Sequence, residues 1–172
     1  HRISYVGELG WELYISTEMA VHVFDEIMKR NKDFPIKLCG LHCLDSCRIE
    51  KAFRHFGHDI STEDNALEAG LGFAVKTQKP RSKFGDFMGK YAIEKTKQEG
   101  FEKRLFQFVL DDPEPLLYHN EPIIRDGKIS GYLTSGNYGH FLGSSVGMGY
   151  VKCNKKGESL EEQLNSEYMI DV

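Results

Sequence analysis

The sequence is poor in cysteine and holds no long apolar run. It has four cysteines in 172 residues, none of them in a Cys-x-x-Cys pair, which argues against a disulfide framework or a zinc site. Cys39, Cys43 and Cys47 recur at every fourth position of a predicted helix. We expect small, buried core residues in a reducing compartment. No stretch of about 18 apolar residues occurs, so we expect no membrane association.

The net charge is small, and a nucleotide-binding motif is also missing from the sequence. The chain carries 22 Lys and Arg against 26 Asp and Glu, a net charge of −4, with the two signs interspersed. We therefore expect no nucleic-acid partner. No Gly-x-Gly-x-x-Gly follows a predicted strand, so this stretch shows no flavin- or nicotinamide-binding fold. His55, His58 and Asp59 form only a weak metal pattern, and we expect no metal.

The segment Tyr5–Tyr14 is the most informative part of the chain. Val6 and Trp11 flank a four-residue loop that begins and ends in glycine, which predicts a tight hairpin. In that register Tyr5 and Glu12 are cross-strand partners on one face. A flat heterocycle could lie against Tyr5 while the Glu12 carboxylate accepts two N–H bonds, which suits an aminopyrimidine such as a pterin. The alternative is an ordinary surface pair.

The remaining pattern predicts an α+β fold with a smaller β-barrel-like domain behind it. We place the two domains at residues 1–100 and 101–172. Arg48 has either a substrate role or, as an amphipathic helix favours, a structural ion pair with Asp45 or Glu50. In the second predicted helix, Leu41, Cys43, Leu44 and Cys47 are expected to face the core. Helices are expected near 16–30, 40–53 and 89–97, and strands near 67–76, 101–110, 122–125, 129–134, 146–151 and 168–172, with a hairpin turn at Asp126-Gly127.

Several motifs, in order along the chain, carry a family resemblance. They are Arg2–Glu12, Gly40-Leu41, Arg48–Ala52, Gly57–Ile60, Leu67–Leu71, Phe87–Lys90, Thr134–Gly136 and Gly147–Val151. Together they resemble the aminomethyltransferase folate-binding family, which includes the glycine cleavage T-protein and the C-terminal region of sarcosine and dimethylglycine dehydrogenases. The details Gly-Glu-Leu-Gly-Trp-Glu and Arg-Ile-Glu-Lys-Ala are more similar to the dehydrogenase branch than to the free T-protein.

The resemblance implies a function and a set of site residues. It implies tetrahydrofolate binding and one-carbon (methylene) transfer, with a small methylated amine as the second partner and FAD in a domain upstream of this sequence. Tyr5 and Glu12 match the folate-contacting positions. Glu8 is a weaker candidate that also suits a turn, and Phe73 suits a pterin wall or core packing equally. The family's catalytic Asp would lie upstream of His1, and Leu44 replaces a folate-contacting Arg of the T-protein.

These matches also imply a setting for the chain. We expect a fragment of an FAD-dependent sarcosine or dimethylglycine dehydrogenase-like enzyme, cut at both ends, inactive by itself and prone to oligomerise. The absence of a signal peptide favours a bacterial cytoplasmic or mitochondrial matrix location over secretion. Two alternatives remain open: a regulatory binding module on the same scaffold, and a folate-dependent demethylase that acts on a non-amine substrate.

Overall fold

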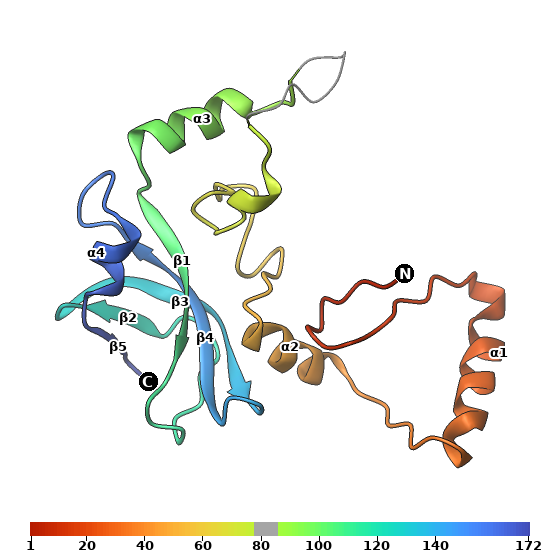
Figure 1. Ribbon diagram of the computed structural model, residues 1–172. Helices are drawn as coiled ribbons and strands as arrows, with labels where there is room; N and C mark the ends of the chain where they lie inside the picture. Colours follow the sequence, from red (N-terminus) through yellow and green to blue (C-terminus); the bar gives the residue numbers. More distant parts are fainter. Residues whose placement is uncertain (78–85) are drawn as a thin grey trace.

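The computed structural model describes residues 1–77 and 86–172 (Figure 1). Its helices are α1 (Thr17–Met28), α2 (Leu41–Glu50), α3 (Lys90–Glu99) and α4 (Leu160–Leu164), with 3₁₀ turns η1 (Lys29–Lys32) and η2 (Gly72–Ala74). Its strands are β1 (Lys103–Val109), β2 (Pro122–Arg125), β3 (Lys128–Gly139), β4 (Ser144–Lys152) and β5 (Tyr168–Ile170). Helices combined with an antiparallel sheet confirm the predicted α+β class.

The strands pair in the order β1-β4-β3-β2-β5, antiparallel throughout. β2 and β3 form the predicted hairpin, in which Arg125 pairs with Lys128. The turn residues Asp126 and Gly127 have φ angles of 50° and 76°. Positive φ at both central positions is what a type I′ hairpin turn requires, and Asp-Gly supplies it at low cost. The prediction of this hairpin is confirmed.

The main core is formed by the sheet and by a loop that crosses it. Leu117 on that loop forms a buried cluster with Ile123, Leu133 and Val151. The loop can lie directly on β3 because residue 136 is glycine. A Cβ built at Gly136 would stand 2.6 Å from the carbonyl carbon of Leu117, closer than real Cβ contacts allow. Any side chain at position 136 would therefore push residues 116–119 away from the sheet.

Helix α2 packs one face on the sheet, but not the predicted face. Ile49 joins Val146 and Met148 in a second buried cluster, and Arg48 is buried beside it. The prediction that Leu41 faces the core is wrong, because Leu41 is 80% exposed. Cys39 and Cys43 are also exposed, so the expected burial of the cysteines fails at both positions. A buried arginine fits this face because two of its partners, Asp59 and Ser135, are buried with it, as described below.

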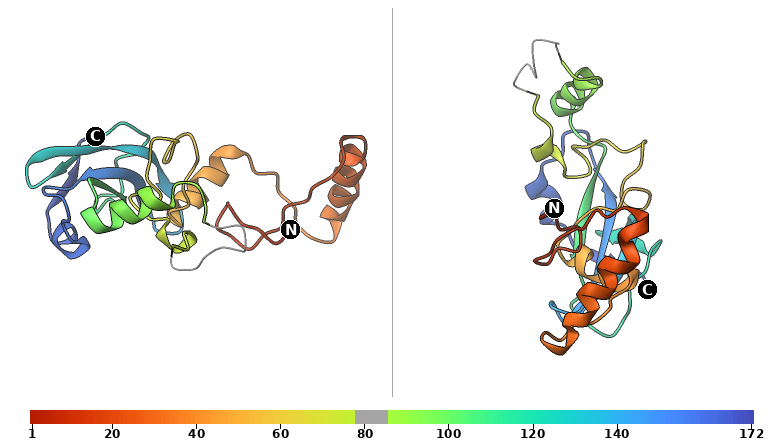
Figure 2. Two further views of the ribbon diagram at one scale, coloured as in Figure 1. Left: turned by 90° about the horizontal axis from the view of Figure 1, so that it is seen from above. Right: turned by 90° about the vertical axis from the view of Figure 1, so that its right-hand side faces the viewer.

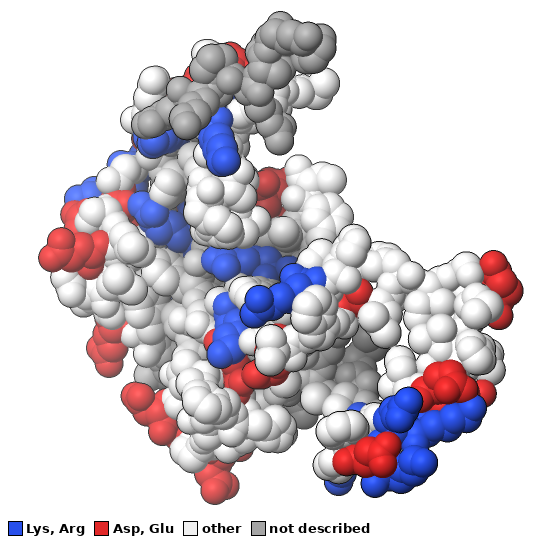
Figure 3. All heavy atoms as spheres, turned by 45° about the vertical axis from the view of Figure 1, so that its right-hand side comes forward, with Lys and Arg blue, Asp and Glu red and all other residues white. Residues whose placement is uncertain are grey.

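Helix α1 stands away from the sheet, as an arm that both figures show (Figure 1, Figure 2). It lies entirely within the described part of the chain, and none of its residues is buried. Val21 and Phe24 are 72% and 48% exposed. Acidic and basic side chains interleave at the far end of the arm (Figure 3), where Lys29 is paired with Glu26. Among the described residues, no helix is both long enough and apolar enough to cross a membrane.

The structure differs from the sequence analysis in two local elements: one predicted strand is missing and one helix was not predicted. The predicted strand over 67–76 is wrong: Gly70 has a φ of 72°, and turns with the 3₁₀ helix η2 replace the strand. The short helix α4 was not anticipated from the sequence. Its start is a capping box, in which the Ser159 side chain accepts from the Glu162 N–H and the Glu162 side chain accepts from the Ser159 N–H. The Ser-x-x-Glu spacing was a readable signal for it.

Candidate functional site

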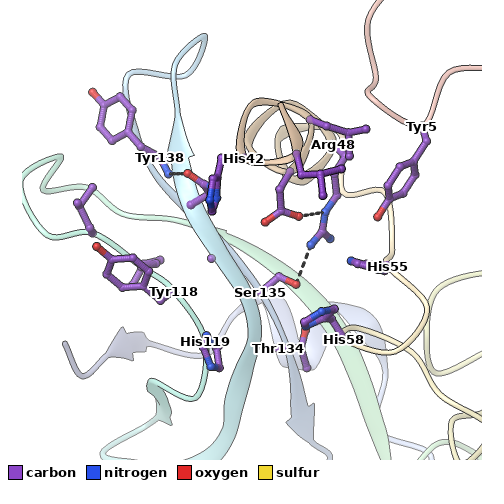
Figure 4. Close-up of a pocket in the computed structure, with 17 residues that line it drawn as sticks. Tyr5, His42, Arg48, His55, His58, Tyr118, His119, Thr134, Ser135 and Tyr138 are labelled. Atoms are coloured by element: carbon purple, nitrogen blue, oxygen red, sulfur yellow. Dashed lines mark hydrogen bonds and ion pairs between the residues drawn. The ribbon is translucent and has the colours of Figure 1, made fainter. Parts of the chain in front are cut away.

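A cavity of about 690 Å³ lies between the N-terminal segment, α2 and the sheet (Figure 4). Its volume falls within the range of about 300–1,000 Å³ that is typical of small-molecule sites. Tyr5 forms part of one wall, and α2 contributes residues from Leu41 to Arg48. The rest comes from the His55–His58 loop, from residues 116–119 and from positions 134–138 of β3. The site therefore combines parts of the chain that are far apart in sequence.

Tyr5 is held in this wall by a compact turn. The Ser4 hydroxyl donates to the Glu8 carbonyl at 2.6 Å and accepts from the Gly7 N–H at 3.0 Å. Gly7 has a φ of 81°, and a Cβ there would lie 2.5 Å from Cγ of Lys51. Glycine is thus required both by the backbone conformation and by the close approach to the end of α2. The turn docks the N-terminal segment against α2 and carries Tyr5 to the cavity.

The predicted pairing of Tyr5 with Glu12 is wrong. Glu12 pairs instead with His1: the Glu12 N–H donates to the His1 carbonyl, and the amino group of His1 donates to the Glu12 carbonyl, both at 2.8 Å. No strand is assigned within the described residues 1–16. The loop is therefore wider than a four-residue hairpin, because the Ser4–Glu8 turn occupies the positions that the hairpin register reserved for strand pairing. The Glu12 side chain accepts a hydrogen bond from the Tyr14 hydroxyl at 2.8 Å.

A buried ionic network forms the floor of the cavity beside Tyr5. Arg48, which is 1% exposed, donates from Nε to Asp45 at 2.6 Å and from Nη2 to the Ser135 hydroxyl at 2.9 Å. Its Nη1 donates to Asp59, which also accepts from the Thr134 hydroxyl at 2.6 Å. The expected structural pair with Asp45 is confirmed. The network ties α2 to β3 and fixes the cavity floor, since buried charges are tolerated only with such partners.

The Tyr5 hydroxyl is a buried polar atom without a partner. No hydrogen bond reaches it from the described residues. Burial raises the pKa of this phenol, and the nearby Arg48 opposes that rise, so the group is neutral at physiological pH. An unsatisfied buried hydroxyl costs about 1–3 kcal/mol. A ligand that hydrogen-bonds to it would recover that cost, which makes the Tyr5 hydroxyl a marker for ligand binding.

The other predicted folate-binding residues lie outside the cavity lining. Glu12 is half-buried and turned toward Tyr14, and Glu8 is exposed on the Ser4–Glu8 turn. Phe73 lies in η2 and is 83% exposed. It is therefore not packed in the core, and it does not line this cavity. The structure therefore brings Tyr5 alone of the four into the cavity, and the roles of Glu12, Glu8 and Phe73 stay predictions.

Several cavity residues were not anticipated from the sequence. His42, Tyr118, His119 and Tyr138 line the cavity, and Figure 4 shows them on the side away from Tyr5. One signal was available on α2, where Leu41, Leu44, Asp45 and Arg48 follow the spacing of a single helix face. That face was assigned to the core, but much of it lines the cavity. Residues 116–119 gave no comparable signal, because a loop carries no periodicity.

Comparison with known proteins places the chain in a family. Residues 1–79 match the model of the GCVT N-terminal domain, and residues 103–172 match that of the glycine cleavage T-protein C-terminal barrel domain. The chain therefore belongs to the aminomethyltransferase (glycine cleavage T-protein) family. The second match agrees with the predicted small β-barrel-like domain. The boundary near residue 100 stays a prediction.

The relatives include enzymes and a regulatory protein. The chain is 45% identical over 147 residues to 4-methylaminobutanoate oxidase (formaldehyde-forming) of Paenarthrobacter nicotinovorans, covering 86% of this chain and 17% of that protein. It is 39% identical to human mitochondrial dimethylglycine dehydrogenase, covering 95% and 19% of the two chains. It is 38% identical to the mouse mitochondrial pyruvate dehydrogenase phosphatase regulatory subunit, covering 99% and 20%. The chain thus spans about a fifth of the length of these curated relatives.

A solved structure supports the fold. The crystal structure of glycine cleavage system aminomethyltransferase T from Bartonella henselae matches with a TM-score of 0.77 and 24% identity. The match covers 88% of this chain and 40% of that chain. At this identity the similarity establishes the fold and leaves the function to be argued from the site.

Proposed function

We propose that this chain binds tetrahydrofolate in the cavity beside Tyr5 and takes part in methylene transfer to it, within an FAD-dependent enzyme that demethylates sarcosine, dimethylglycine or a similar small amine. The observation that carries the proposal is the cavity itself. It has the volume of a small-molecule site and an aromatic wall whose hydroxyl has no hydrogen-bond partner among the described residues. The amine oxidation would take place on flavin in another domain of the natural protein, in a bacterial cytoplasm or a mitochondrial matrix.

The residues of the cavity fit a pterin-containing ligand. The Tyr5 ring offers a flat surface for stacking, and Leu41 and Leu44 add apolar contact. Asp45 Oδ1 accepts from Arg48, while its second oxygen has no donor among the described residues. That oxygen and the Tyr5 hydroxyl could bind N–H groups at the edge of an aminopyrimidine.

Catalysis by this chain would be positional. Bound tetrahydrofolate supplies the nitrogen atoms that accept the one-carbon unit. Tyr5 would hold the ligand in one orientation, the Arg48 network would keep the cavity floor rigid, and the cavity walls would keep water from the reacting carbon. A rigid floor matters here, because orientation is lost when supporting residues move. The burial of Arg48 and Asp59 in one network meets that requirement.

The proposal is tested by titrating the full-length natural protein with tetrahydrofolate while free formaldehyde is assayed. Tyr5→Ala should lower folate affinity at least roughly tenfold, since stacking contributes about 0.5–1.5 kcal/mol and the hydroxyl a similar amount. Product should shift from methylenetetrahydrofolate toward formaldehyde. Tyr91→Ala, on the exposed side of α3, is the matched control and should change neither. Equal affinities in all three proteins would refute the proposed site.

Glu12, Glu8 and Phe73 remain part of the proposal. Glu12 would reach the pterin edge only if the bond to Tyr14 is exchanged for a bond to the ligand. Under this proposal Glu12→Gln also lowers folate affinity about tenfold, because an amide donor then faces the donors of the pterin. Unchanged affinity in that variant would remove Glu12 from the site and leave Tyr5 as the pterin contact.

A second candidate function is a binding module without demethylation. The 38% identity to a phosphatase regulatory subunit, over 99% of this chain, favours it. Both functions allow folate binding, so affinity alone does not separate them. Formation of methylenetetrahydrofolate from a methylated amine by the full-length protein would favour the enzyme. Folate binding without turnover of sarcosine, dimethylglycine or 4-methylaminobutanoate would favour the module.

A further inference from the structure

We propose that Glu50, at the end of α2, is a positioning residue for methylene transfer. Its carboxyl group holds the turn between β3 and β4 against α2, and this contact keeps the cavity wall at Asn137 and Tyr138 in place. The inference rests on the proposed function, because it concerns how the ligand is oriented in the same cavity. Asn137 and Tyr138 line the cavity and Glu50 does not, so Glu50 acts through the wall.

Glu50 binds the backbone of the β3–β4 turn at two points. Its Oε1 accepts from the Phe141 N–H at 2.8 Å and from the Leu142 N–H at 3.4 Å. Glu50 was one of the two expected ion-pair partners of Arg48, but in the described part of the chain Arg48 pairs with other carboxylates. Hydrogen bonds from backbone N–H groups to a carboxylate are among the stronger ones. The Glu50 side chain is therefore committed to the turn.

Further contacts fix the two ends of this link. The Ser46 hydroxyl, one turn before Glu50 on α2, donates to the Tyr138 carbonyl at 2.6 Å, so the last lining residue of β3 is bonded to the same helix. The Gln107 side chain on β1 donates to the carbonyls of Ile49 and Glu50 at 2.6 and 3.1 Å. These carbonyls belong to the last turn of α2, where no intrahelical donor remains. The part of α2 that carries Glu50 is thus itself fixed to the sheet.

The wall that the turn carries has few other supports. Residues 134–138 of β3 line the cavity. β2 pairs with β3 only as far as Tyr132, and backbone bonds from residues 120 and 121 extend that contact only to Leu133. Beyond Leu133, β4 is the one strand that pairs with β3 in the part of the chain that the structure describes. Figure 4 shows Tyr138 and Tyr5 on opposite sides of α2. The place of this wall therefore depends on the side chains that α2 extends to it.

A displaced wall would affect the fate of the one-carbon unit. Transfer of this carbon to a ligand nitrogen competes with its release as formaldehyde, and transfer wins only if the ligand is held in one orientation and water is kept out. A misplacement of about 1 Å, caused by a change far from the reacting atoms, can cost about 100-fold in rate. Amine oxidation on flavin does not use this wall under the proposed function. Loss of the Glu50 contact should therefore change the product ratio and leave amine oxidation unchanged.

The chain contains a matched control for this contact. Glu68 is also half-buried, and its Oε1 accepts from the Glu102 N–H at 2.8 Å and from the Lys103 N–H at 3.3 Å. It fastens the start of β1 in the way that Glu50 fastens the β3–β4 turn. Neither Glu68 nor the two residues that it binds line the cavity. Glu68→Ala therefore removes the same kind of bonds and leaves the cavity wall untouched.

The experiment measures the ratio of free formaldehyde to methylenetetrahydrofolate that the full-length natural protein forms from a methylated amine at saturating tetrahydrofolate. Glu50→Ala should raise this ratio about tenfold, with the rate of amine oxidation unchanged. Glu50→Gln keeps a side-chain oxygen that accepts both N–H bonds, so its ratio should stay within about twofold of the wild type. Glu50→Asp, whose side chain is one methylene shorter, should give a smaller rise and replaces Glu50→Ala if that variant does not fold. Urea unfolding of each variant, with Glu68→Ala as the control, measures the loss of stability separately.

The outcomes separate this inference from the proposed function. If Glu50→Ala lowers the urea midpoint but leaves the product ratio unchanged, Glu50 is only structural, and this inference fails while the folate site stands. An equal rise in Glu68→Ala would trace the effect to lost stability and would overturn the inference as well. A Glu50→Gln variant as impaired as Glu50→Ala would overturn the assignment to the two N–H bonds. If the wild-type protein neither binds tetrahydrofolate nor forms methylenetetrahydrofolate, the proposed function fails, and this inference fails with it.

Discussion

At the scale of single residues, Tyr5 and Arg48 define the site in complementary ways. Every contact of the buried Arg48 guanidinium is to another part of the protein, so it supports the cavity rather than the ligand. The Tyr5 hydroxyl, by contrast, is buried and has no hydrogen-bond partner in the part of the chain that the structure describes. A protein that carries such a group gains stability when a ligand completes the bond. This contrast gives different expectations for substitutions at the two positions.

Tyr5→Phe should affect ligand binding and stability in opposite directions. The substitution removes an unpaired buried hydroxyl and keeps the ring, so the free protein should be unchanged or up to about 1 kcal/mol more stable. Tetrahydrofolate affinity should fall about two- to tenfold, the effect of one lost hydrogen bond. Thermal unfolding with and without ligand measures both quantities. A variant that is clearly less stable when free would show that the hydroxyl already has a partner.

Arg48→Met should destabilise the fold strongly. It leaves Asp59 buried without its cation, and breaking a buried pair costs about 3–5 kcal/mol. Arg30→Met is the matched control, because Arg30 is exposed and lies 3.9 Å from Asp33; its effect should be below about 1 kcal/mol. Urea unfolding followed by circular dichroism compares the two. Equal midpoints for both variants would contradict the structural role of the Arg48 network.

At the scale of elements, a second buried ion pair fastens the C-terminal segment to the sheet. Arg125 on β2 binds Glu158, just before α4, through two bonds of 3.0 and 2.7 Å. The hydrogen bonds from Arg125 lower the pKa of Glu158; burial opposes the shift, and the Asn154 N–H adds to it. A carboxyl with a lowered pKa stabilises the fold above its unfolded pKa of about 4.3. That contribution is lost as pH falls through the lower folded value.

Glu158→Gln should therefore remove a pH-dependent part of the stability. At pH 7 we expect a loss of about 3 kcal/mol, the low end for breaking a buried pair. The difference from wild type should narrow as pH falls below about 4, because the wild-type carboxylate is then protonated as well. Glu161→Gln, an exposed residue of α4, serves as the control. Urea unfolding at several pH values provides the measurement, and a difference that is constant with pH would contradict the assignment.

Local signals in the sequence predicted some elements and missed others for physical reasons. The β2–β3 hairpin was predictable because Asp126-Gly127 alone sets the turn. The span 67–76 was not, because its apolar residues suggested a strand while Gly70 places the backbone in a left-handed turn. At the N-terminus, the glycines predicted a hairpin turn at Gly7–Gly10. The turn lies instead over Ser4–Glu8, held by the Ser4 hydroxyl, and Glu12 pairs with His1.

Only one residue of the candidate site could be predicted from a sequence motif. Tyr5 was identified from the motif, and it does line the cavity. His42 and His119 were missed because their place in the cavity lining depends on α2 packing on the sheet and on a loop crossing β3. Helix periodicity tells which residues share a face of α2, but it does not say whether that face meets a core or a cavity.

At the scale of the whole molecule, exposed apolar surface is concentrated on the N-terminal arm. Trp11 is 67% exposed, Leu13 is 61% exposed, and α1 buries none of its residues. Monomeric proteins rarely leave such a surface uncovered. The sheet also ends in edge strands β1 and β5, which can pair with other chains. The 172-residue chain by itself therefore has two routes to association.

We expect the isolated chain to be oligomeric or poorly soluble. Light scattering should give a mass above that of one chain, increasing with concentration. Val21→Glu, on the exposed face of α1, should reduce association if the apolar arm drives it, whereas Glu26→Gln on the same helix should not. A stable monomer that melts cooperatively would contradict this expectation.

The most direct test of the proposed folate site is a crystal structure of the full-length natural protein with tetrahydrofolate. We predict that the pterin lies in the cavity between Tyr5 and β3, that it forms a hydrogen bond with the Tyr5 hydroxyl, and that the Arg48–Asp59 pair beneath it is unchanged. Folate bound elsewhere on the protein, or a cavity that stays empty at saturating tetrahydrofolate, would contradict the proposed function.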